Sequence, residues 1–571
     1  MPGDGLCSGL AAHRGLTEPG DGRAPPSARV LWGPLRAPRP HTRLPARLMD
    51  PTTPLFHHPT YSDAQQVLEA IFGYREFRPG QRRIIDAVLA GRDCIGVMPT
   101  GAGKSLTFQI PARMLPGSVL VISPLISLMK DQVDALVRLG FKAVMVNSSL
   151  SFDERRERLA AFRRGELELL YLAPEALEGS LRGFIADCPV SLVVVDEAHC
   201  ISHWGHDFRP AYRKLRGLKQ ELGEIPVLAL TATATRRVAA DIIAQLGMKK
   251  PDGFKGSFYR QNLRITAVRK GEGKTATGAT KPARNVRKDL LSLLRTRRGE
   301  SAIVYCMSRK SVESTAEFLA ANGIKAVPYH AGLPDGVRAK NQDAFARDDI
   351  DVVVATVAFG MGIDKSNVRL VVHRDMPKSI EAWVQEIGRA GRDGLPSECI
   401  VYYSWADVIG YDSFLSGIDD PALRDETRKK TVELFRLLDS NMCRHQLACH
   451  YFDETLPPCG ESCDVCTGKG IETLVVVPAS FTASGMVRGA GAASVTLSDD
   501  ALERFNRLRA VRKRLADAEG VPAYIVFSDA ALRGMAERRP ISAAELLAVP
   551  GVGPVKLERY GDAFLEALRE G

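Results

Sequence analysis

The stretch DCIGVMPTGAGKS, Asp93–Ser105, decides the fold. It is a short apolar run followed by a glycine-rich segment that ends in Lys-Ser, and an amphipathic stretch comes next. Gly101 and Gly103 allow the backbone to curl so that its N–H groups face a phosphate. Lys104 and Ser105 are then placed to reach the β- and γ-phosphates and Mg²⁺. The stretch predicts a buried strand, a phosphate-binding loop and a helix.

A second motif, VVVDEAHC, follows further along the chain and carries two carboxylates. An apolar strand ending in Asp196 and Glu197 places them at the carboxyl edge of a sheet, where phosphate-loop proteins hold their metal. We expect Asp196 to bind Mg²⁺ with Ser105, and Glu197 to orient and deprotonate the attacking water. Met98 replaces the usual first glycine of the loop pattern, so an incidental glycine-rich turn is the alternative for that segment. The two motifs together favour nucleotide hydrolysis.

Apolar runs and amphipathic stretches alternate from about residue 60 to residue 410. Near-continuous apolar strands separated by helices indicate parallel sheets covered on both faces. A polar, turn-rich break at Arg269–Lys288 interrupts the alternation. We therefore predict an α/β protein with two tandem lobes. The strand candidates are DCIGVM, SVLVIS, LELLYLA, SLVVVDEA and PVLALTA, then SAIVYC, KAVPYH, VVVATVA, LVVH and CIVYY.

The composition predicts a division of the chain into six segments. Met49 opens a more ordinary N-terminus than Met1, so a non-native upstream start and a basic nucleic-acid-binding arm are both open for the first segment. The segments are a disordered Pro/Arg-rich stretch (1–58), a first lobe with the ATP site (59–262), a second lobe (263–410), a helical zinc-binding subdomain (411–470), a linker (471–497) and a small all-α domain (498–571).

The net charge, the hydrophobicity and the cysteine count limit the possible classes of function. A net charge of +10 over 571 residues suggests a polyanionic partner, although any basic soluble protein would look the same. No apolar run approaches the ~20 residues of a membrane span, and the start lacks an apolar signal core. Five of the eleven cysteines lie within Cys443–Cys466, a pattern of metal binding in a reducing compartment. We expect a soluble protein of a bacterial cytoplasm or a nucleus, with the bacterial cytoplasm and nucleoid preferred.

The clustered cysteines suit a structural, tetrahedral Zn²⁺. Cys449 lies six residues after Cys443, about 240° around a helix, so the two cannot share a ligand face. Cys449 is therefore assigned to the core. The expected zinc ligands are Cys443, Cys459, Cys463 and Cys466.

The segment CISHWGHDFRPAY, directly after DEAH, is too aromatic for an ordinary surface loop. Aromatic rings stack on single-stranded bases for about 1–3 kcal/mol each. Trp204 and Phe208 are the expected stackers, and Arg209 is the expected phosphate or cation–π contact. Because the loop follows Glu197, strand binding could reposition the catalytic carboxylate. The alternatives are core aromatics with satisfied histidines, and a histidine metal site.

Two further segments suggest contacts to phosphate. In QEIGRAGRDG, Arg389 and Arg392 are expected to face the triphosphate and stabilise its developing charge, the alternative being a solvated basic helix. In the C-terminal VPGVGPVKLERYG, Gly551 and Gly553 could expose N–H groups to a nucleic-acid phosphate, with Lys556 nearby. The alternative for that segment is a helical packing or docking module with a tight turn.

Seven motifs in order resemble superfamily-2 helicases, and with the cysteine cluster they resemble the RecQ family of DNA helicases. The motifs are FRPGQ, MPTGAGKS, SPLISLMKDQ, DEAH, LTATAT, TVAFGMGIDK and QEIGRAGRDG. The resemblance covers roughly Asp63 to Cys466, and the C-terminal part is similar to an HRDC domain. It implies two RecA-like lobes, ATP, Mg²⁺ and Zn²⁺ as cofactors, and 3′–5′ translocation on single-stranded and forked DNA in repair and recombination.

The resemblance also implies roles for matching residues. Arg78 and Gln81 would recognise adenine, with Tyr74 or Phe77 beside it, and Thr231 and Thr233 would link the ATP state to lobe movement. Ser123–Gln132 and Ala173–Glu175 would grip the DNA backbone, and Gly360, Gly362, Asp364 and Lys365 would contact strand and nucleotide. The implied nucleotide-binding set is Arg78, Gln81, Thr100, Gly101, Ala102, Gly103, Lys104, Ser105, Gly360, Asp364 and Gln385.

The chain departs from the RecQ pattern in two places. Three residues separate Cys459 from Cys463 where the family has two, so His445 or His450 could replace Cys459. About thirty residues lie between Cys466 and the C-terminal helices, too few for the winged helix that often splits the duplex. Two alternatives follow: an RNA helicase or duplex translocase, and a DNA-stimulated ATPase or annealing switch that does not unwind processively.

Overall fold

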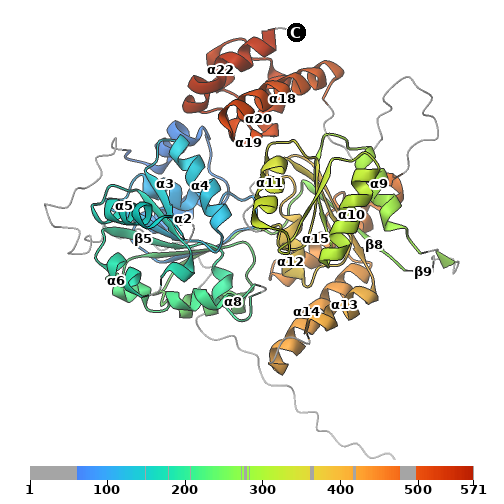
Figure 1. Ribbon diagram of the computed structural model, residues 1–571, viewed down its shortest axis with the longest axis horizontal. Coiled ribbons are helices and arrows are strands. Elements are labelled where there is room, and N and C mark those ends of the chain that lie inside the picture. Colours follow the sequence, from blue (N-terminus) through green and yellow to red (C-terminus); the bar gives the residue numbers. More distant parts are fainter. Residues whose placement is uncertain are drawn as a thin grey trace, which may run out of the picture.

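The fold is an assembly of two α/β lobes, a helical module and a small helical domain (Figure 1). The computed structural model describes residues 61–147, 150–177, 179–205, 207–271, 273–274, 280–281, 283–360, 365–415, 420–475 and 497–569. The expectations for residues 1–58 and for most of the linker therefore lie outside the described residues, as do those for Gly362 and Asp364.

The first lobe is built on a seven-stranded sheet in the order β3-β4-β2-β5-β6-β1-β7, with every pairing parallel. The five inner strands are fully buried and mostly apolar, because helices cover both faces of the sheet. The strands are β1 (Cys94–Val97), β2 (Ser118–Ile122), β3 (Ala143–Val146), β4 (Leu169–Leu172), β5 (Val190–Val195), β6 (Val227–Thr231) and β7 (Asp252–Lys255).

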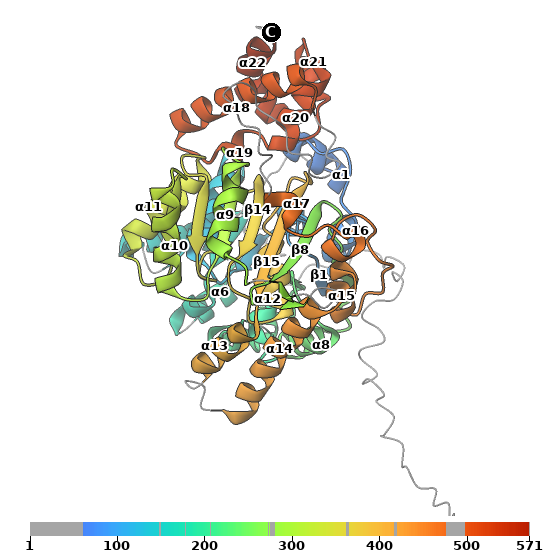
Figure 2. The same cartoon turned by 90° about the vertical axis from the view of Figure 1, so that its right-hand side faces the viewer.

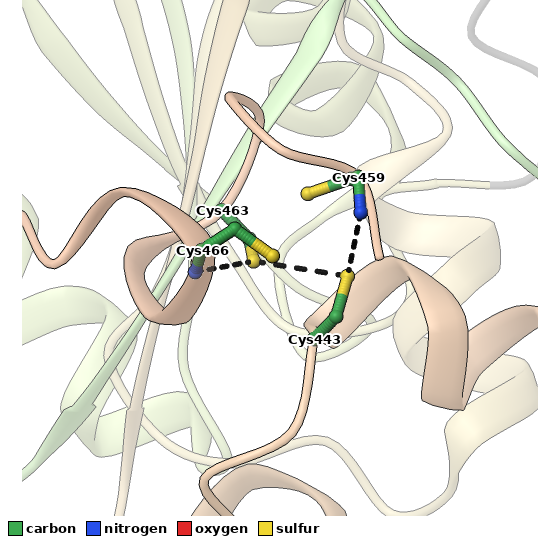
Figure 3. A group of neighbouring side chains, drawn as sticks. All are labelled: Cys443, Cys459, Cys463 and Cys466. Carbon is green, nitrogen blue, oxygen red and sulfur yellow. Dashed lines mark hydrogen bonds between the residues drawn. The ribbon is translucent and has the colours of Figure 1, made fainter. Parts of the chain in front are cut away.

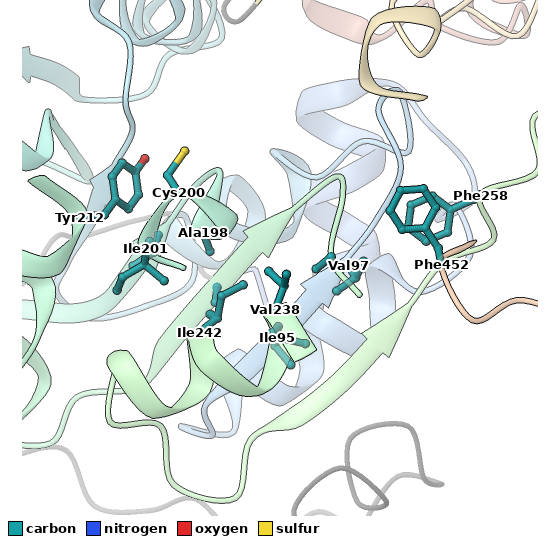
Figure 4. Packing of buried hydrophobic residues seen from close by; sticks show 14 of the residues in the cluster. Ile95, Val97, Ala198, Cys200, Ile201, Tyr212, Val238, Ile242, Phe258 and Phe452 are labelled. Carbon is teal, nitrogen blue, oxygen red and sulfur yellow. The ribbon is translucent and has the colours of Figure 1, made fainter. Parts of the chain in front are cut away.

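The helices of the first lobe connect these strands. They are α1 (Ala64–Val67), η3 (Leu68–Phe72), α2 (Gln81–Leu89), α3 (Leu106–Ala112), α4 (Ile126–Arg138), α5 (Phe152–Arg163), η4 (Pro174–Ala176), α6 (Ser180–Ala186), η5 (Ala198–Ile201), η6 (Pro210–Leu215), α7 (Leu218–Glu221) and α8 (Arg236–Gln245). Figure 4 shows how η5 packs its apolar side chains, with Tyr212, toward Ile242 and Val238 of α8 and toward β1. The segment after the two carboxylates is thus fixed to the lobe core.

The second lobe has a six-stranded parallel sheet in the order β12-β13-β11-β14-β15-β8. Together with the first sheet it confirms the prediction of two parallel-sheet lobes. Its elements are β8 (Leu263–Arg269), the hairpin strands β9 (Gly273–Lys274) and β10 (Thr280–Lys281), α9 (Val286–Arg295), β11 (Ser301–Tyr305), α10 (Arg309–Ala321), β12 (Ala326–Tyr329), α11 (Asp335–Ala346), β13 (Val352–Ala355), β14 (Val368–His373), α12 (Ile380–Ile387) and β15 (Ser397–Tyr403).

A helical module follows and packs where the two lobes meet. The ring of Phe452 stacks on Phe258 of the connection between the lobes, with centroids 4.1 Å apart (Figure 4). The backbone N–H of Ile265, in the edge strand β8, donates to Ser462 O at 3.0 Å. The module contains α13 (Trp405–Leu415), α14 (Pro421–Asp439), α15 (Arg444–Tyr451), α16 (Asp464–Thr467) and α17 (Glu472–Val475).

The C-terminal helices form a separate small domain that rests on both lobes (Figures 1 and 2). Its turn at Gly553 lies against the backbone of Gly73 in the first lobe, so closely that there is no room for a Cβ on either glycine. On the second lobe, Arg512 pairs with Asp348 at 3.4 Å. The helices are α18 (Asp499–Glu519), α19 (Ala523–Val526), α20 (Asp529–Arg538), α21 (Ala543–Leu547) and α22 (Pro554–Arg569).

No helix in the described part of the chain is both long and apolar enough to cross a membrane.

Candidate functional site

The phosphate-binding loop connects β1 to α3, as the sequence predicts. Gly101 and Gly103 have φ of 84° and 78°, a left-handed backbone that glycine adopts without strain. The Nζ of Lys104 donates to Met98 O at 3.2 Å, inside the curl of the loop. The N–H of Met98 in turn donates to Thr231 O at 2.9 Å. The loop is therefore bonded to the end of β6, where the LTATAT motif begins.

Arg78 and Gln81 lie directly beside this loop. The amide nitrogen of Gln81 donates to Gly103 O at 2.9 Å and to Ala102 O at 3.2 Å, and a guanidinium nitrogen of Arg78 donates to Gly101 O. The amide oxygen of Gln81 accepts from the Arg78 N–H at 2.8 Å. This pair is thus brought to the nucleotide-binding loop, as the implied role in adenine recognition requires.

The two carboxylates stand at the end of β5. Burial, with the nearby charge of Glu197 as a second cause, raises the pKa of Asp196 to about 7. Glu197 has φ of 47°, so the chain adopts a left-handed backbone directly after the strand. Its Oε2 is buried and has no hydrogen-bond partner among the described residues. A desolvated carboxylate beside such an oxygen, close to Lys104 and Ser105, is a donor set that fits Mg²⁺ and a water molecule.

His199 connects Glu197 to the LTATAT segment. Its Nδ1 lies 2.9 Å from Thr231 Oγ1 and 3.4 Å from Glu197 Oε2. Burial lowers the pKa of His199 to about 4, so the imidazole is neutral at pH 7. Because the ring is neutral, it can couple a movement of Thr231 to a movement of Glu197 without adding a charge. The sequence analysis did not assign His199 a role, although its place in DEAH is a signal for one.

The structure separates the two arginines of QEIGRAGRDG. Arg392 crosses the interlobe cleft, and its side chain would lie 3.5 Å from a Cβ placed on Gly101. Arg389 is buried in the second lobe and donates to Gly360 O instead. Gln385 lines a cavity between the lobes together with Thr100 and Thr233. In this conformation Arg392 faces the phosphate-binding loop and Arg389 does not.

Arg260 is a bridging residue that the sequence analysis missed. It lies between the lobes and donates to Thr100 O at 2.9 Å, Ala390 O at 3.0 Å and Gly391 O at 2.6 Å. Burial lowers its pKa to about 10, and it still carries its charge at pH 7. Three backbone carbonyls from two lobes converge on one guanidinium. The only signal in the sequence was an arginine in the connection between the lobes.

The aromatic-rich loop lies on the surface of the first lobe. Trp204 is 41% exposed, which excludes a core role, and the guanidinium of Arg237 in α8 lies 3.1 Å from its ring centroid. The half-buried Phe208 stacks on the His203 ring with centroids 3.9 Å apart. Among the described residues the histidines form no metal-ligand group, since the only such group is the cysteine cluster.

The C-terminal part of this loop is bonded to the backbone of Asp196 and to the SPLISLMKDQ segment. Tyr212 is fully buried and its hydroxyl donates to Asp196 O at 2.9 Å. Arg209 donates to Pro124 O at 3.2 Å, in the SPLISLMKDQ motif, and its backbone N–H donates to Cys200 O at 2.9 Å. A shift of the loop therefore acts directly on the backbone that carries the catalytic carboxylates.

The four predicted zinc ligands converge at one point (Figure 3). The sulfur atoms of Cys443, Cys459, Cys463 and Cys466 all lie within 4.8 Å of one another. Cys459 belongs to this group despite its extra spacer residue, and the Cys459 N–H donates to Cys443 Sγ at 3.3 Å. Cys449 is buried outside the group, as expected. Four thiols at tetrahedral spacing leave no position for water and fit a structural Zn²⁺.

The remaining predicted DNA contact, Lys556, is not brought to the others. Its Nζ donates to Ile525 O at 2.8 Å and lies 5.5 Å from the Phe527 ring centroid, and burial lowers its pKa to about 8. The adjacent turn at Gly551 and Gly553 packs on the first lobe instead of presenting free N–H groups at a groove. The placement follows the alternative stated for this segment, a docking module with a tight turn.

Family profiles match most of the chain. The DEAD/DEAH box helicase profile matches residues 78–242 and the helicase conserved C-terminal domain matches residues 285–394. The RecQ zinc-binding profile matches residues 405–467, and the HRDC domain matches residues 501–568. Each profile falls on a unit described above.

Curated relatives agree over nearly the whole length. The chain is 37% identical to the ATP-dependent DNA helicase RecQ of Pasteurella multocida over 614 aligned positions, which cover 90% of this chain and 95% of the relative. It is 35% identical to the ATP-dependent DNA helicase RecQ of Bacillus subtilis, with 89% and 98% covered. In the first alignment roughly a hundred positions of the relative have no counterpart here. The chain belongs to the RecQ family of ATP-dependent DNA helicases.

Proposed function

We propose that this protein is a Mg²⁺- and ATP-dependent helicase that moves 3′ to 5′ on single-stranded DNA and opens duplex or forked DNA during repair and recombination. The observation that carries the proposal is a pair of bonds from the C-terminal part of the aromatic-rich loop. Tyr212 bonds the backbone of Asp196, and Arg209 bonds the SPLISLMKDQ segment. Coupling of ATP hydrolysis to strand movement needs a strand-binding loop that is bonded to the segment carrying the catalytic carboxylates.

Hydrolysis requires groups from both lobes. Arg78 and Gln81 would hold the adenine end, and the loop Thr100–Ser105 with Lys104 would hold the phosphates. Mg²⁺, held by Ser105 and Asp196, would neutralise charge on the β- and γ-phosphates. Glu197 would orient and deprotonate the attacking water, a contribution of about 10²- to 10⁴-fold.

Arg392, which already lies beside the phosphate-binding loop, would supply charge from the second lobe. Arg389 is tied to Gly360 and would join it only after leaving that carbonyl. Arg260 already spans the cleft, so it would keep Thr100 and the Ala390 carbonyl in register as the lobes rotate. Gly360, Asp364 and Gln385 complete the proposed nucleotide contacts. Closing and opening the cleft in each ATP cycle would advance the strand.

Strand binding is proposed for Trp204, Phe208 and Arg209. Trp204 is exposed enough to accept a stacked base, and Arg209 is half-buried with its guanidinium near Pro124. Stacking is worth about 1–3 kcal/mol per base and does not depend on sequence. Single-stranded and forked DNA are therefore the proposed partners. The bacterial relatives support a place in a bacterial cytoplasm, on the nucleoid.

A second candidate function is favoured by the length of the chain. The relative's surplus of roughly a hundred positions corresponds in size to a winged-helix domain, and few residues separate the zinc subdomain from the HRDC domain here. Without that domain the protein could hydrolyse ATP and translocate, or switch its DNA affinity, without separating strands. The residues between 476 and 496 lie outside those that the structure describes.

One experiment distinguishes the two functions. ATP-dependent unwinding is measured on matched 3′-tailed, 5′-tailed and forked duplexes, with Lys104→Ala as the inactive control, and ATPase stimulation is compared between DNA and RNA strands. We expect unwinding of the 3′-tailed and forked substrates only, lost in the variant. Strong DNA-stimulated hydrolysis with every duplex intact would establish the translocase instead. Greater stimulation by RNA would contradict both.

A further inference from the structure

A lysine of the zinc-binding subdomain lies where three parts of the molecule meet. Lys430, in α14, donates from Nζ to the backbone carbonyl of Trp204 at 3.1 Å. The same ammonium lies 3.2 Å from Oε1 of Glu381 in α12. Its side chain is 17% exposed and that of Glu381 is 7% exposed, so both charges are largely removed from water. One cation thus joins the aromatic-rich loop of the first lobe to a helix of the second.

The helix on the other side of this contact carries groups of the ATP site. Glu381 is the second residue of α12, which contains Gln385 and ends just before Arg389 and Arg392. At the far end of the helix, a Cβ on Gly388 would lie 3.0 Å from Thr100 of the phosphate-binding loop. A displacement of α12 at its first turn is therefore a displacement of the arginine segment against the nucleotide.

The contact is held in place from the zinc side. The hydroxyl of Tyr451, in α15, donates to the same Glu381 Oε1 at 2.6 Å. Thr431 Oγ1, next to Lys430, donates to Lys378 O at 2.8 Å, just before α12. These bonds fix α14 and α15 to α12, so the three helices form one body. The bond to the Trp204 carbonyl connects this body to the aromatic-rich loop, in addition to the contacts that Lys255 and Arg236 of the first lobe make with Phe452 and Asp453.

A stacked base acts on that bond. Trp204 is anchored by its ring against Arg237 and by its carbonyl on Lys430. A base stacked on the exposed ring would act on the same residue whose carbonyl Lys430 holds. The ammonium then loses or tightens one of its two acceptors. In a largely buried site the loss of one acceptor costs more free energy than at the surface, because little water is present to replace the lost hydrogen bond.

We propose that Lys430 is a positioning residue for ATP hydrolysis: it transmits strand binding at the aromatic-rich loop to α12 and the arginines that follow it. The proposal rests on the proposed function, since it takes Trp204 to be a strand contact. Lys430 itself touches neither nucleotide nor strand. Its removal should therefore break the communication between two sites while leaving each site intact.

The test compares Lys430→Met with Lys429→Met in the full-length protein. Lys429 is the adjacent, exposed lysine of the same helix, so its substitution changes charge and helix propensity equally. For Lys430→Met we expect unchanged basal ATPase, unchanged affinity for a single-stranded oligothymidylate, and stimulation by that strand reduced about tenfold, the size of one lost charged hydrogen bond. Lys429→Met should behave as wild type.

A second variant guards against misfolding. Lys430→Met leaves the buried Glu381 carboxylate without its cation, which alone can destabilise the fold. The double variant Lys430→Met/Glu381→Gln removes both charges and keeps an acceptor for Tyr451. It should show the same loss of stimulation with a normal melting temperature. Wild-type stimulation in this folded double variant would overturn the proposal.

Hydrogen exchange of the DNA-free protein separates this proposal from the proposed function. In Lys430→Met, amides of residues 202–205 and of α12 should both exchange faster than in Lys429→Met. If wild-type protein were not stimulated by DNA at all, the proposed function would fail. The exchange result would then decide the junction alone, and unchanged exchange in either segment would overturn it.

Discussion

Substituting Gly553 by alanine should release the HRDC domain from the first lobe without unfolding it. A Cβ on Gly553 would lie 2.9 Å from Gly73 Cα and 3.1 Å from Gly73 N. Both neighbours are backbone atoms, so no side-chain rotation relieves the overlap. Ordinary contact would require the domain to withdraw by about 0.5–1 Å. Gly553 itself has no left-handed φ, so alanine fits its own turn.

The cost of this overlap is large compared with what holds the domain. Overpacking a tight contact costs about 1–3 kcal/mol, a 5- to 150-fold shift of the docking equilibrium. On the second lobe the domain is held in part by Lys513 and Asp349, 2.5 Å apart with side chains 39% and 50% exposed. Such a pair contributes at most about 1 kcal/mol. The buried pair of Arg512 and Asp348 is the stronger polar contact, and it would have to lengthen as the domain withdraws.

Hydrogen exchange and small-angle scattering provide the assay. Gly553→Ala should speed exchange in η3 and increase the radius of gyration, with exchange inside α18–α22 unchanged. Gly336→Ala, at a position in α11 with open space around it, is the matched control. Gly551→Ala is the contrast, because Gly551 has φ of 88° and alanine there should strain the HRDC domain itself. Unchanged exchange in η3 for Gly553→Ala would refute the reasoning.

Three shorter predictions concern the site and the two helical domains. Glu197→Gln should retain ATP binding and lose hydrolysis by about 10²- to 10⁴-fold in single-turnover assays; a loss under tenfold would remove it as the base. Cys459→Ser should lower both the zinc content by mass spectrometry and the melting temperature, whereas Cys449→Ser should keep one zinc per chain; equal zinc loss would contradict the assignment. Lys556→Met should stabilise the HRDC domain at pH 7 by about 1–3 kcal/mol, since burial lowers the lysine pKa to about 8 and disfavours its charge in the folded state. Wild-type stability should therefore rise from pH 8 toward 10.5 and the difference should shrink; a constant difference in unfolding free energy would contradict this.

The sequence predicted the two sheets because their central strands are buried on both faces. Such strands read as continuous apolar runs, and β1, β2, β5 and β6 were all found this way. The strands that were missed, β3, β7 and β8, all lie at sheet edges. An edge strand is partly exposed, so β7 is written DGFK and β8 alternates buried with half-buried residues. Apolar runs alone do not reveal strands of this kind.

The candidate site was predictable where its chemistry is local and not where it depends on distant pairs. The phosphate-binding loop and the carboxylate pair are contiguous, so spacing gave their context. Arg260 and Lys430 donate to backbone carbonyls of residues far away in the chain. Every residue has a backbone carbonyl, so no residue type in the sequence indicates such a contact. The contact expected of Lys556 stays a prediction: a lysine after a glycine turn suggests a phosphate contact, whereas in this structure its ammonium group contacts Ile525 O and the Phe527 ring.

The zinc subdomain packs on the second lobe through β8 and α12, and it contacts the first lobe through Lys430 and Lys255. The subdomain extends the edge of β8, and Glu454 accepts from the N–H of Phe258 at 2.7 Å in the connection between the lobes. A zinc ion held by the four cysteines would brace the subdomain beside this connection. A rotation of the lobes about that connection leaves Lys430 fixed to α12 and carries Trp204 away with the first lobe. Such a rotation would strain the bond between Lys430 and the Trp204 carbonyl while it changes the position of Arg392 against the phosphate-binding loop. The position of the strand and the closure of the cleft would then be coupled through Lys430.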